Sequence, residues 1–250
     1  MTLNSELETR NFLIETRALV KAYGLLPVLR KLDLGITRGE FVALLGPNGS
    51  GKSTLLRLLA GLSKPTAGQI LIGGWTLPDE AAAVRAQIGM VSHKVLLYEN
   101  LSARENLRFF ARLYNLPPAG VDARLAELLE QVGLSRRAAD PVRTFSRGMQ
   151  QRLSIARALL HNPDILLLDE PYTGLDVDAS SVLDGLLRDA HAGGRTILMT
   201  THQLDSAAAL AGRVVILSRG GIGYDAPTAG LDGARLSAIY TETTSMVSAR

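Results

Sequence analysis

Residues 46–54 of this 250-residue chain read Gly46-Pro47-Asn48-Gly49-Ser50-Gly51-Lys52-Ser53-Thr54. The stretch fits the phosphate-binding pattern G-x-x-x-x-G-K-[ST], and it lies between a strand-like run, FVALL, and a helix-like run, TLLRLL. Its glycines let backbone N–H groups turn toward a polyanion, and the start of the helix adds partial positive charge. We therefore predict that these nine residues bind nucleotide phosphates, with Lys52 at the β- and γ-phosphates and Ser53 on Mg²⁺.

A second group of polar residues ends the apolar run DILLLDE at residues 164–170. In an open α/β sheet, ligands bind outside the carboxyl ends of the strands, where Asp169 and Glu170 would lie. We predict that Asp169 holds Mg²⁺, through water, and that Glu170 is the general base for an attacking water molecule. An exposed pair of carboxylates is the alternative, and the phosphate-binding stretch disfavours it.

Strand-like and helix-like runs alternate through the rest of the chain, which predicts a parallel sheet covered on both faces. Residues 12–45 predict a strand-rich start with a turn at Pro27. A helix starting at Pro78 is expected after them, and a last helix is expected near residues 227–241.

The period changes to that of helices from about residue 102. Ser102 and Glu105 have the spacing of a capping box, and Gly133 is placed as a C-terminal stop. This region predicts a helical block of about 60 residues.

Composition excludes several classes of protein. The chain has no cysteine, so disulfides, thiolate metal sites and a cysteine nucleophile are excluded. The apolar runs are too short to cross a bilayer, and the first 20 residues carry charges where a signal peptide would be apolar, so we expect a cytoplasmic protein. The net charge is only +3 and the basic residues are dispersed, so we expect no nucleic-acid partner.

The order of these motifs resembles that of the ATP-binding subunits of ABC transporters, over nearly the whole chain. Three further segments carry the resemblance: Phe145 to Arg152, which is similar to the family's signature; Gly174 to Asp176, similar to its D-loop; and Thr200 to His202, similar to its switch histidine. The resemblance implies a P-loop α/β core, the ABC ATPase fold, with a β-rich N-terminal subdomain. It also implies one ATP-binding domain over residues 1–250, with an inserted helical subdomain at 94–162.

The resemblance further implies that this chain hydrolyses ATP with Mg²⁺ as a homodimer. Two ATP molecules would be sandwiched between the chains, with the signature residues Ser146, Arg147, Gly148 and Met149 contacting the partner's nucleotide. Lys52, Glu170 and His202 would be catalytic, and Asp176 would contact the dimer partner. Tyr23 fits the aromatic residue that stacks on adenine, with a surface or core tyrosine as the alternative.

Two positions depart from the family pattern. Arg147 and Met149 stand where Gly and Gln are usual, which puts the side-chain contacts of the signature in doubt. His93 stands where the family has the glutamine that links the ATP site to the membrane subunit. An imidazole reaches as far as an amide but does not donate and accept in the same way, so His93 is either the coupling residue or an ordinary loop histidine.

The partner implied by the resemblance is an integral membrane transporter subunit, which would hold the chain on the cytoplasmic side of the cell membrane. Residues 95–98, Val-Leu-Leu-Tyr, are expected to form its docking groove, with internal packing as the alternative. The amino-acid sequence of residues 92–116 and 145–176 most resembles that of the ATP-binding subunit of the cytochrome c maturation, or heme, exporter. The alternatives are an ABC-2-type drug or polysaccharide exporter, a soluble ABC-type ATPase acting in DNA repair or translation, and a non-hydrolysing nucleotide-binding module.

Overall fold

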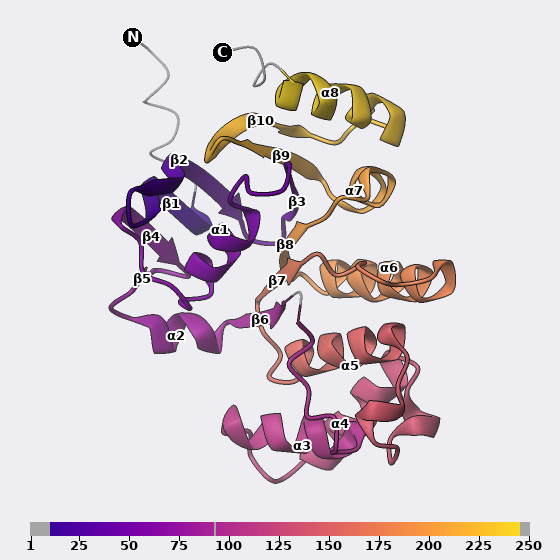
Figure 1. The fold of residues 1–250 in the computed structure, drawn as a ribbon. Coiled ribbons are helices and arrows are strands. Elements are labelled where there is room, and N and C mark those ends of the chain that lie inside the picture. The colour runs from indigo at the N-terminus through magenta and orange to yellow at the C-terminus, as the bar shows by residue number, and fades with distance from the viewer. Residues whose placement is uncertain (1–10, 93, 246–250) are drawn as a thin grey trace.

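The computed structural model describes residues 11–92 and 94–245, whose strands form two sheets (Figure 1). The first sheet is antiparallel, in the order β2-β1-β4-β5. Its strands are β1 (Phe12–Tyr23), β2 (Leu26–Thr37), β4 (Ala67–Ile72) and β5 (Trp75–Leu77). The second sheet has the order β10-β9-β3-β8-β7-β6 and is parallel except for β10 at its edge. Its strands are β3 (Phe41–Leu45), β6 (Ile88–Val91), β7 (Ile165–Asp169), β8 (Thr196–Thr200), β9 (Arg213–Ser218) and β10 (Gly221–Pro227).

Helices surround the six-stranded sheet, and three of them, α3 to α5, lie together beyond its β6 edge (Figure 1). In chain order they are α1 (Lys52–Leu59), α2 (Ala81–Ala86), α3 (Ala103–Leu113), α4 (Val121–Gln131), α5 (Arg147–Leu159), α6 (Val177–Ala192), α7 (Leu204–Leu210) and α8 (Gly233–Ser245). No helix within 11–92 and 94–245 is both long and apolar enough to cross a membrane.

Two hydrophobic cores lie on opposite faces of the six-stranded sheet. Phe41, Ala43 and Leu45 of β3 face the core that includes helices α3 to α8, whereas Val42 and Leu44 face the core that includes α1 and the antiparallel sheet. The alternation follows from the pleat of a strand, and burial on both faces explains why the sequence of β3 is wholly apolar. The predicted α/β fold, with a mainly parallel sheet covered on both faces, is therefore confirmed.

Three local predictions are wrong. The first turn lies at Gly24 and Leu25, and Pro27 belongs to β2, an edge strand, where a missing N–H is tolerated. Pro78 precedes α2, because residues 76–80 first close a turn in which the Glu80 N–H donates to the Thr76 carbonyl. The last helix starts at Gly233, because Gly221–Pro227 pairs with β9 as strand β10.

The predicted capping box is confirmed. The Ser102 hydroxyl accepts from the Glu105 N–H, and the Glu105 carboxylate accepts from the Ser102 N–H at 2.8 Å. Gly133, with φ of +65°, follows the end of α4. The subdomain boundaries at 94 and 162 stay predictions.

Asn106 holds the loop before α3 in place. This side chain is fully buried, and its oxygen accepts from the Tyr98 N–H at 2.8 Å. Its amide nitrogen donates to the carbonyls of Tyr98, Leu101 and Ser102. One amide therefore satisfies several groups of residues 98–102, where a shorter apolar side chain would satisfy none.

We predict that Asn106→Ala lowers the free energy of unfolding by about 1–3 kcal/mol, because buried polar groups lose their partner. Urea denaturation followed by circular dichroism measures this change. Asn100→Ala, at an exposed position in the same loop, is the control and should change stability little. Equal stability of the two variants would contradict the role of Asn106.

Candidate nucleotide site

The loop between β3 and α1 needs glycine at two positions. Gly46 has φ of +149°, and a Cβ there would lie 2.5 Å from the Leu217 carbonyl oxygen. Gly51 has φ of +107°, and a Cβ there would lie 2.6 Å from the Leu29 side chain. Gly51 is also the N-cap of α1, with no side-chain cap and no acid in the first turn. The first N–H groups of α1 thus remain available to an anion, as the predicted phosphate site requires.

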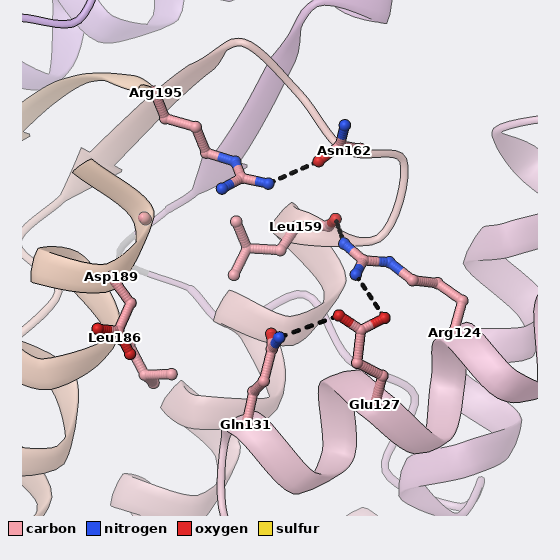
Figure 2. Close-up of a pocket in the computed structure, with 9 residues that line it drawn as sticks. Arg124, Glu127, Gln131, Leu159, Asn162, Leu186, Asp189 and Arg195 are labelled. Atoms are coloured by element: carbon pink, nitrogen blue, oxygen red, sulfur yellow. Dashed lines mark hydrogen bonds and ion pairs between the residues drawn. The ribbon is translucent and has the colours of Figure 1, made fainter. Parts of the chain in front are cut away.

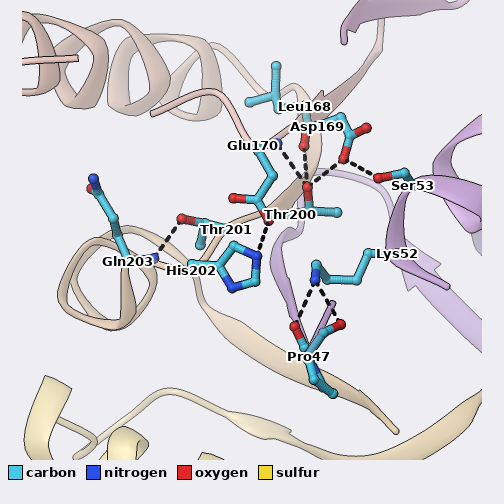
Figure 3. A network of polar contacts seen from close by, with 11 residues as sticks. Pro47, Lys52, Ser53, Leu168, Asp169, Glu170, Thr200, Thr201, His202 and Gln203 are labelled. Carbon is cyan, nitrogen blue, oxygen red and sulfur yellow. Dashed lines mark hydrogen bonds and ion pairs between the residues drawn. The ribbon is translucent and has the colours of Figure 1, made fainter. Parts of the chain in front are cut away.

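Lys52 is a cation held inside this loop. Its side chain is buried, and Nζ donates to the carbonyl oxygens of Gly46 at 2.7 Å and Pro47 at 3.3 Å (Figure 3). Burial lowers the pKa of the Lys52 ammonium, and the nearby carboxylates of Glu170 and Asp169 oppose that shift. The ammonium therefore lies where it could neutralise a bound phosphate.

Ser53 and Asp169 form a pair of oxygen donors suited to Mg²⁺. The Ser53 hydroxyl donates to Asp169 Oδ1 at 3.0 Å, and the Thr200 hydroxyl donates to the same oxygen at 2.9 Å. Within 11–92 and 94–245 no cluster of three or more His, Cys, Asp or Glu could hold a metal. The hydroxyl of Ser53 and the carboxylate of Asp169 fit a hard cation that takes only one or two protein ligands and completes its shell with phosphates and water.

Glu170 follows Asp169 in a strained conformation. Its φ is +52°, a left-handed value that costs a non-glycine residue about 1–2 kcal/mol. Its N–H lies 2.9 Å from the Thr200 hydroxyl oxygen, and its Oε1 lies 3.1 Å from His202 Nε2 (Figure 3). Burial raises the pKa of the Glu170 carboxyl, with His202 and Lys52 opposing and Asp169 adding to the rise. This backbone turns the two adjacent carboxylates to different partners.

A cavity of about 560 Å³ brings many of the predicted residues together, although Gly46, Pro47 and Asp169 are not among its lining residues. Residues Asn48 to Thr54 line it, with Glu170 and His202. Val28 and Thr173 also line it and were not predicted. Thr200 is another omission, because the sequence pattern gave it no role although it bonds to both carboxylate-bearing residues.

The signature residues 146–149 do not line this cavity. The Ser146 hydroxyl caps α5 by accepting from the Met149 N–H at 3.3 Å, and Met149 packs in part against the core. A Cβ on Gly148 would lie 3.0 Å from Ala179, so the start of α5 lies against the start of α6. Asp176 caps α6 by accepting from the Ala179 N–H at 2.8 Å. The signature residues and Asp176 therefore lie together at the starts of α5 and α6, apart from the cavity beside the phosphate loop.

One other predicted residue, Tyr23, also lies apart from the cavity. Tyr23 does not line it; its side chain is half exposed, with Lys21 Nζ 4.8 Å above the ring. A buried core position is thus excluded for Tyr23, while adenine stacking stays a prediction. His93 lies outside the described residues.

Helix α5 holds the segment on both sides of residue 93 through side chains that the sequence did not single out. Buried Arg157 donates to the carbonyls of Met90 at 2.9 Å and Leu96 at 3.2 Å. Ser154 donates to the Val95 carbonyl, and His161 Nε2 lies 3.1 Å from the Ile88 carbonyl oxygen. The helix that starts with the signature is thereby tied to the end of β6. In the sequence, Arg157 is the one charged residue of the apolar run LSIARALL, and this was the available sign that it has a structural role.

A second cavity, of about 380 Å³, lies between α4, α5 and α6 (Figure 2). Arg124 donates to Glu127 and to the Leu159 carbonyl, and Arg195 donates to Asn162 at 2.6 Å. Its polar groups largely pair with one another, and no predicted site residue lines it. Many of the predicted site residues instead line the cavity beside Lys52.

Residues 95–98, which are expected to form the docking groove for the membrane subunit, differ in how far they are buried. Leu97 packs in part against the core, and Val95 is half-buried, as the internal-packing alternative requires. Leu96 and Tyr98 are 58% and 49% exposed, as the docking alternative requires.

Comparisons with known protein sequences lead to the ABC transporter family and to ATP-binding proteins. A sequence model described as ABC transporter matches residues 29–173. The linearmycin resistance ATP-binding protein LnrL of Bacillus subtilis (strain 168) is 35% identical over 83% of this chain and 67% of its own length. The Nod factor export ATP-binding protein I of Cupriavidus pinatubonensis is 41% identical over 83% of this chain and 64% of its own length.

The fold comparison agrees. A dimeric ATP-binding cassette in a post-hydrolysis state, bound to ADP and Pi, superposes with a TM-score of 0.80 and 31% identity. That match covers 87% of this chain and all of the other. The two sequence relatives extend well beyond the segment they share with this chain, which covers about two thirds of each.

We predict that the acidic limb of kcat/KM for ATP hydrolysis lies above pH 4.5, because burial raises the pKa of Glu170 above that ordinary value. A base must be ionised to accept a proton, so the rate should rise with pH through the raised pKa. Steady-state rates of the full chain across pH, over a range where circular dichroism shows it folded, test this. A limb at or below pH 4.5 would show that Glu170 is not the titrating base.

Proposed function

We propose that this chain, which belongs to the ABC transporter family and is an ABC ATPase domain, powers an ABC-2-type exporter. It would do so through a separate membrane subunit. The observation that carries the proposal is the single cavity that joins the phosphate loop, Glu170 and His202 while leaving the signature residues outside. A site divided in this way is completed by a second copy of the chain.

The signature then has a specific role. The start of α5 presents its first N–H groups and Ser146 beside the start of α6, at a distance from the chain's own Lys52 cavity. In a head-to-tail homodimer, this helix N-terminus would face the γ-phosphate on the partner's loop. Asp176, which caps α6 next to it, would lie at the same contact.

The mechanism follows from the residues around the cavity. Lys52 and the N–H groups of the loop would hold the phosphates, while Ser53 and Asp169 would hold Mg²⁺. Bound Mg²⁺ supplies positive charge that stabilises the transferred phosphoryl group. The Glu170 carboxylate would accept a proton from the attacking water at one Oε atom. His202, 3.1 Å from Glu170, would contact the γ-phosphate and help to orient that carboxylate.

Binding of ATP by both chains would stabilise the closed dimer, and release of products would allow it to open. A ligand shifts a conformational equilibrium only by its difference in affinity for the two states. Here the difference arises because only the closed dimer brings the signature of one chain to the nucleotide of the other. The opening and closing would be transmitted to the membrane subunit.

The relatives described above are named for linearmycin resistance and Nod factor export rather than heme export. We therefore place a drug or polysaccharide exporter ahead of a heme exporter and of a role in cytochrome c biogenesis. Docking on the cytoplasmic side of the membrane, through a face that includes Leu96 and Tyr98, is part of the same proposal.

We predict that Glu170→Gln binds ATP but slows its hydrolysis by at least about 10²-fold, because the amide is a poor base. An ATP-dependent dimer should then accumulate on gel filtration, whereas Lys52→Ala should bind ATP weakly and stay monomeric. Glu99→Gln, an exposed glutamate, is the control and should hydrolyse ATP like the unmodified chain. Hydrolysis at an unchanged rate by Glu170→Gln would rule out the base.

We predict that Leu96→Glu weakens assembly with the membrane subunit by about tenfold or more, because a contact of over about 1.4 kcal/mol is lost. The melting temperature of the isolated chain should hardly change. The neighbouring substitution Leu97→Glu should instead lower the melting temperature, since Leu97 packs against the core. Copurification from detergent and thermal unfolding distinguish the two. Unchanged assembly of Leu96→Glu would remove this residue from the docking face.

A further inference from the structure

We propose that the outer face of helix α3 binds the anionic phospholipid headgroups of a membrane surface. This inference goes beyond the proposed function and does not depend on which compound is exported. It begins from the spacing of three arginines. Arg104, Arg108 and Arg112 are each four residues apart, so they form one stripe along α3.

The stripe is exposed and mostly without acidic partners. Arg104 and Arg112 are exposed, and neither forms an ion pair or side-chain hydrogen bond within the described part of the chain. Arg108 pairs with Asp122 of α4. Glu105 also lies on α3, where its carboxylate is engaged by the Ser102 N–H at the helix start. The two acids near the stripe therefore already have partners, while two of its three arginines do not.

Positive charge is concentrated in the segment of sequence that contains this helix. Residues 94–162 contain eleven Lys and Arg against six Asp and Glu, a net charge of +5. The remaining residues contain sixteen Lys and Arg against eighteen Asp and Glu, a net charge of −2. The overall value of +3 thus conceals a separation of charge, and the positive part includes α3. A surface of this sign is complementary to anionic lipid.

Apolar side chains beside the stripe favour a bilayer over a purely ionic partner. Leu113, 59% exposed, and Tyr114, 38% exposed, follow Arg112 at the end of α3. Between α3 and α4 lies a cavity of about 270 Å³, lined by Arg108, Arg112 and the Asp122 that pairs with Arg108. Leu116 and Val121 are among its apolar lining residues.

Together these features form a cationic rim around apolar surface. Arginines can bind lipid phosphates while leucine and tyrosine side chains enter the boundary between headgroups and acyl chains. A basic residue near an anionic membrane strengthens binding by about fivefold. The two unpaired arginines should therefore account for about 25-fold in affinity.

The test is sedimentation of the full chain with vesicles of equal parts phosphatidylglycerol and phosphatidylcholine, and with vesicles of phosphatidylcholine alone. We expect binding to the anionic vesicles only, and weaker binding at high salt. Arg104→Gln combined with Arg112→Gln should reduce it by about 25-fold. The double lysine variant at these positions should retain most of it, because lipid attraction needs charge more than guanidinium geometry.

The matched control is Arg85→Gln combined with Arg235→Gln, two exposed arginines outside α3 with the same total change of charge. An equal loss of binding in this control would overturn the proposal, since net charge would then suffice. Equal binding to both vesicle types, or none to the anionic ones, would also overturn it. If the glutamine variant at 104 and 112 instead lost only assembly with the membrane subunit in detergent, the face would bind an acidic protein surface. ATPase activity of the variants, measured without vesicles, separates this outcome from failure of the proposed function.

Discussion

The backbone of residues 46–51 imposes the tightest constraint on this molecule. The chain leaves a fully buried strand and must turn over the first residues of α1, with no room for a side chain at Gly46 or Gly51. This turn is possible only if β3 is held firmly by neighbours on both sides, which β8 and β9 provide. Strand β7, which pairs with β8, ends in the Asp169 that Ser53 contacts, so one arrangement of strands fixes both the loop and this carboxylate.

The carboxyl ends of parallel strands explain why much of the site was predictable. Asp169 ends β7, and Thr200 ends β8, beside the loop that follows β3, so residues far apart in sequence meet at one edge of the sheet. Patterns with fixed spacing, such as the phosphate loop and the capping box, depend only on nearby residues. They could therefore be predicted without knowledge of the rest of the fold.

Features that depend on distant packing could not be predicted in this way. Arg157 bonds to backbone carbonyls about 60 residues away in sequence, and carbonyls leave no mark in an amino-acid pattern. Strand β10 mixes glycine, proline and polar residues with apolar ones, and its pairing with β9 makes it a strand. The left-handed backbone of Glu170 was hidden for the same reason, since it is imposed by contacts with β8 rather than by a glycine.

The two hydrophobic cores are separated by a single layer of strands, and alternate residues of each strand belong to one core or the other. A change of side-chain volume on the helical side therefore reaches the phosphate loop in part through strand backbones that are hydrogen-bonded on both edges. The six-stranded sheet thus separates the core that includes α3 to α8 from the core that includes α1, the helix that follows the phosphate loop. Substitutions in the core on the helical side would therefore disturb the loop less than substitutions in the core that contains α1, which follows the loop directly.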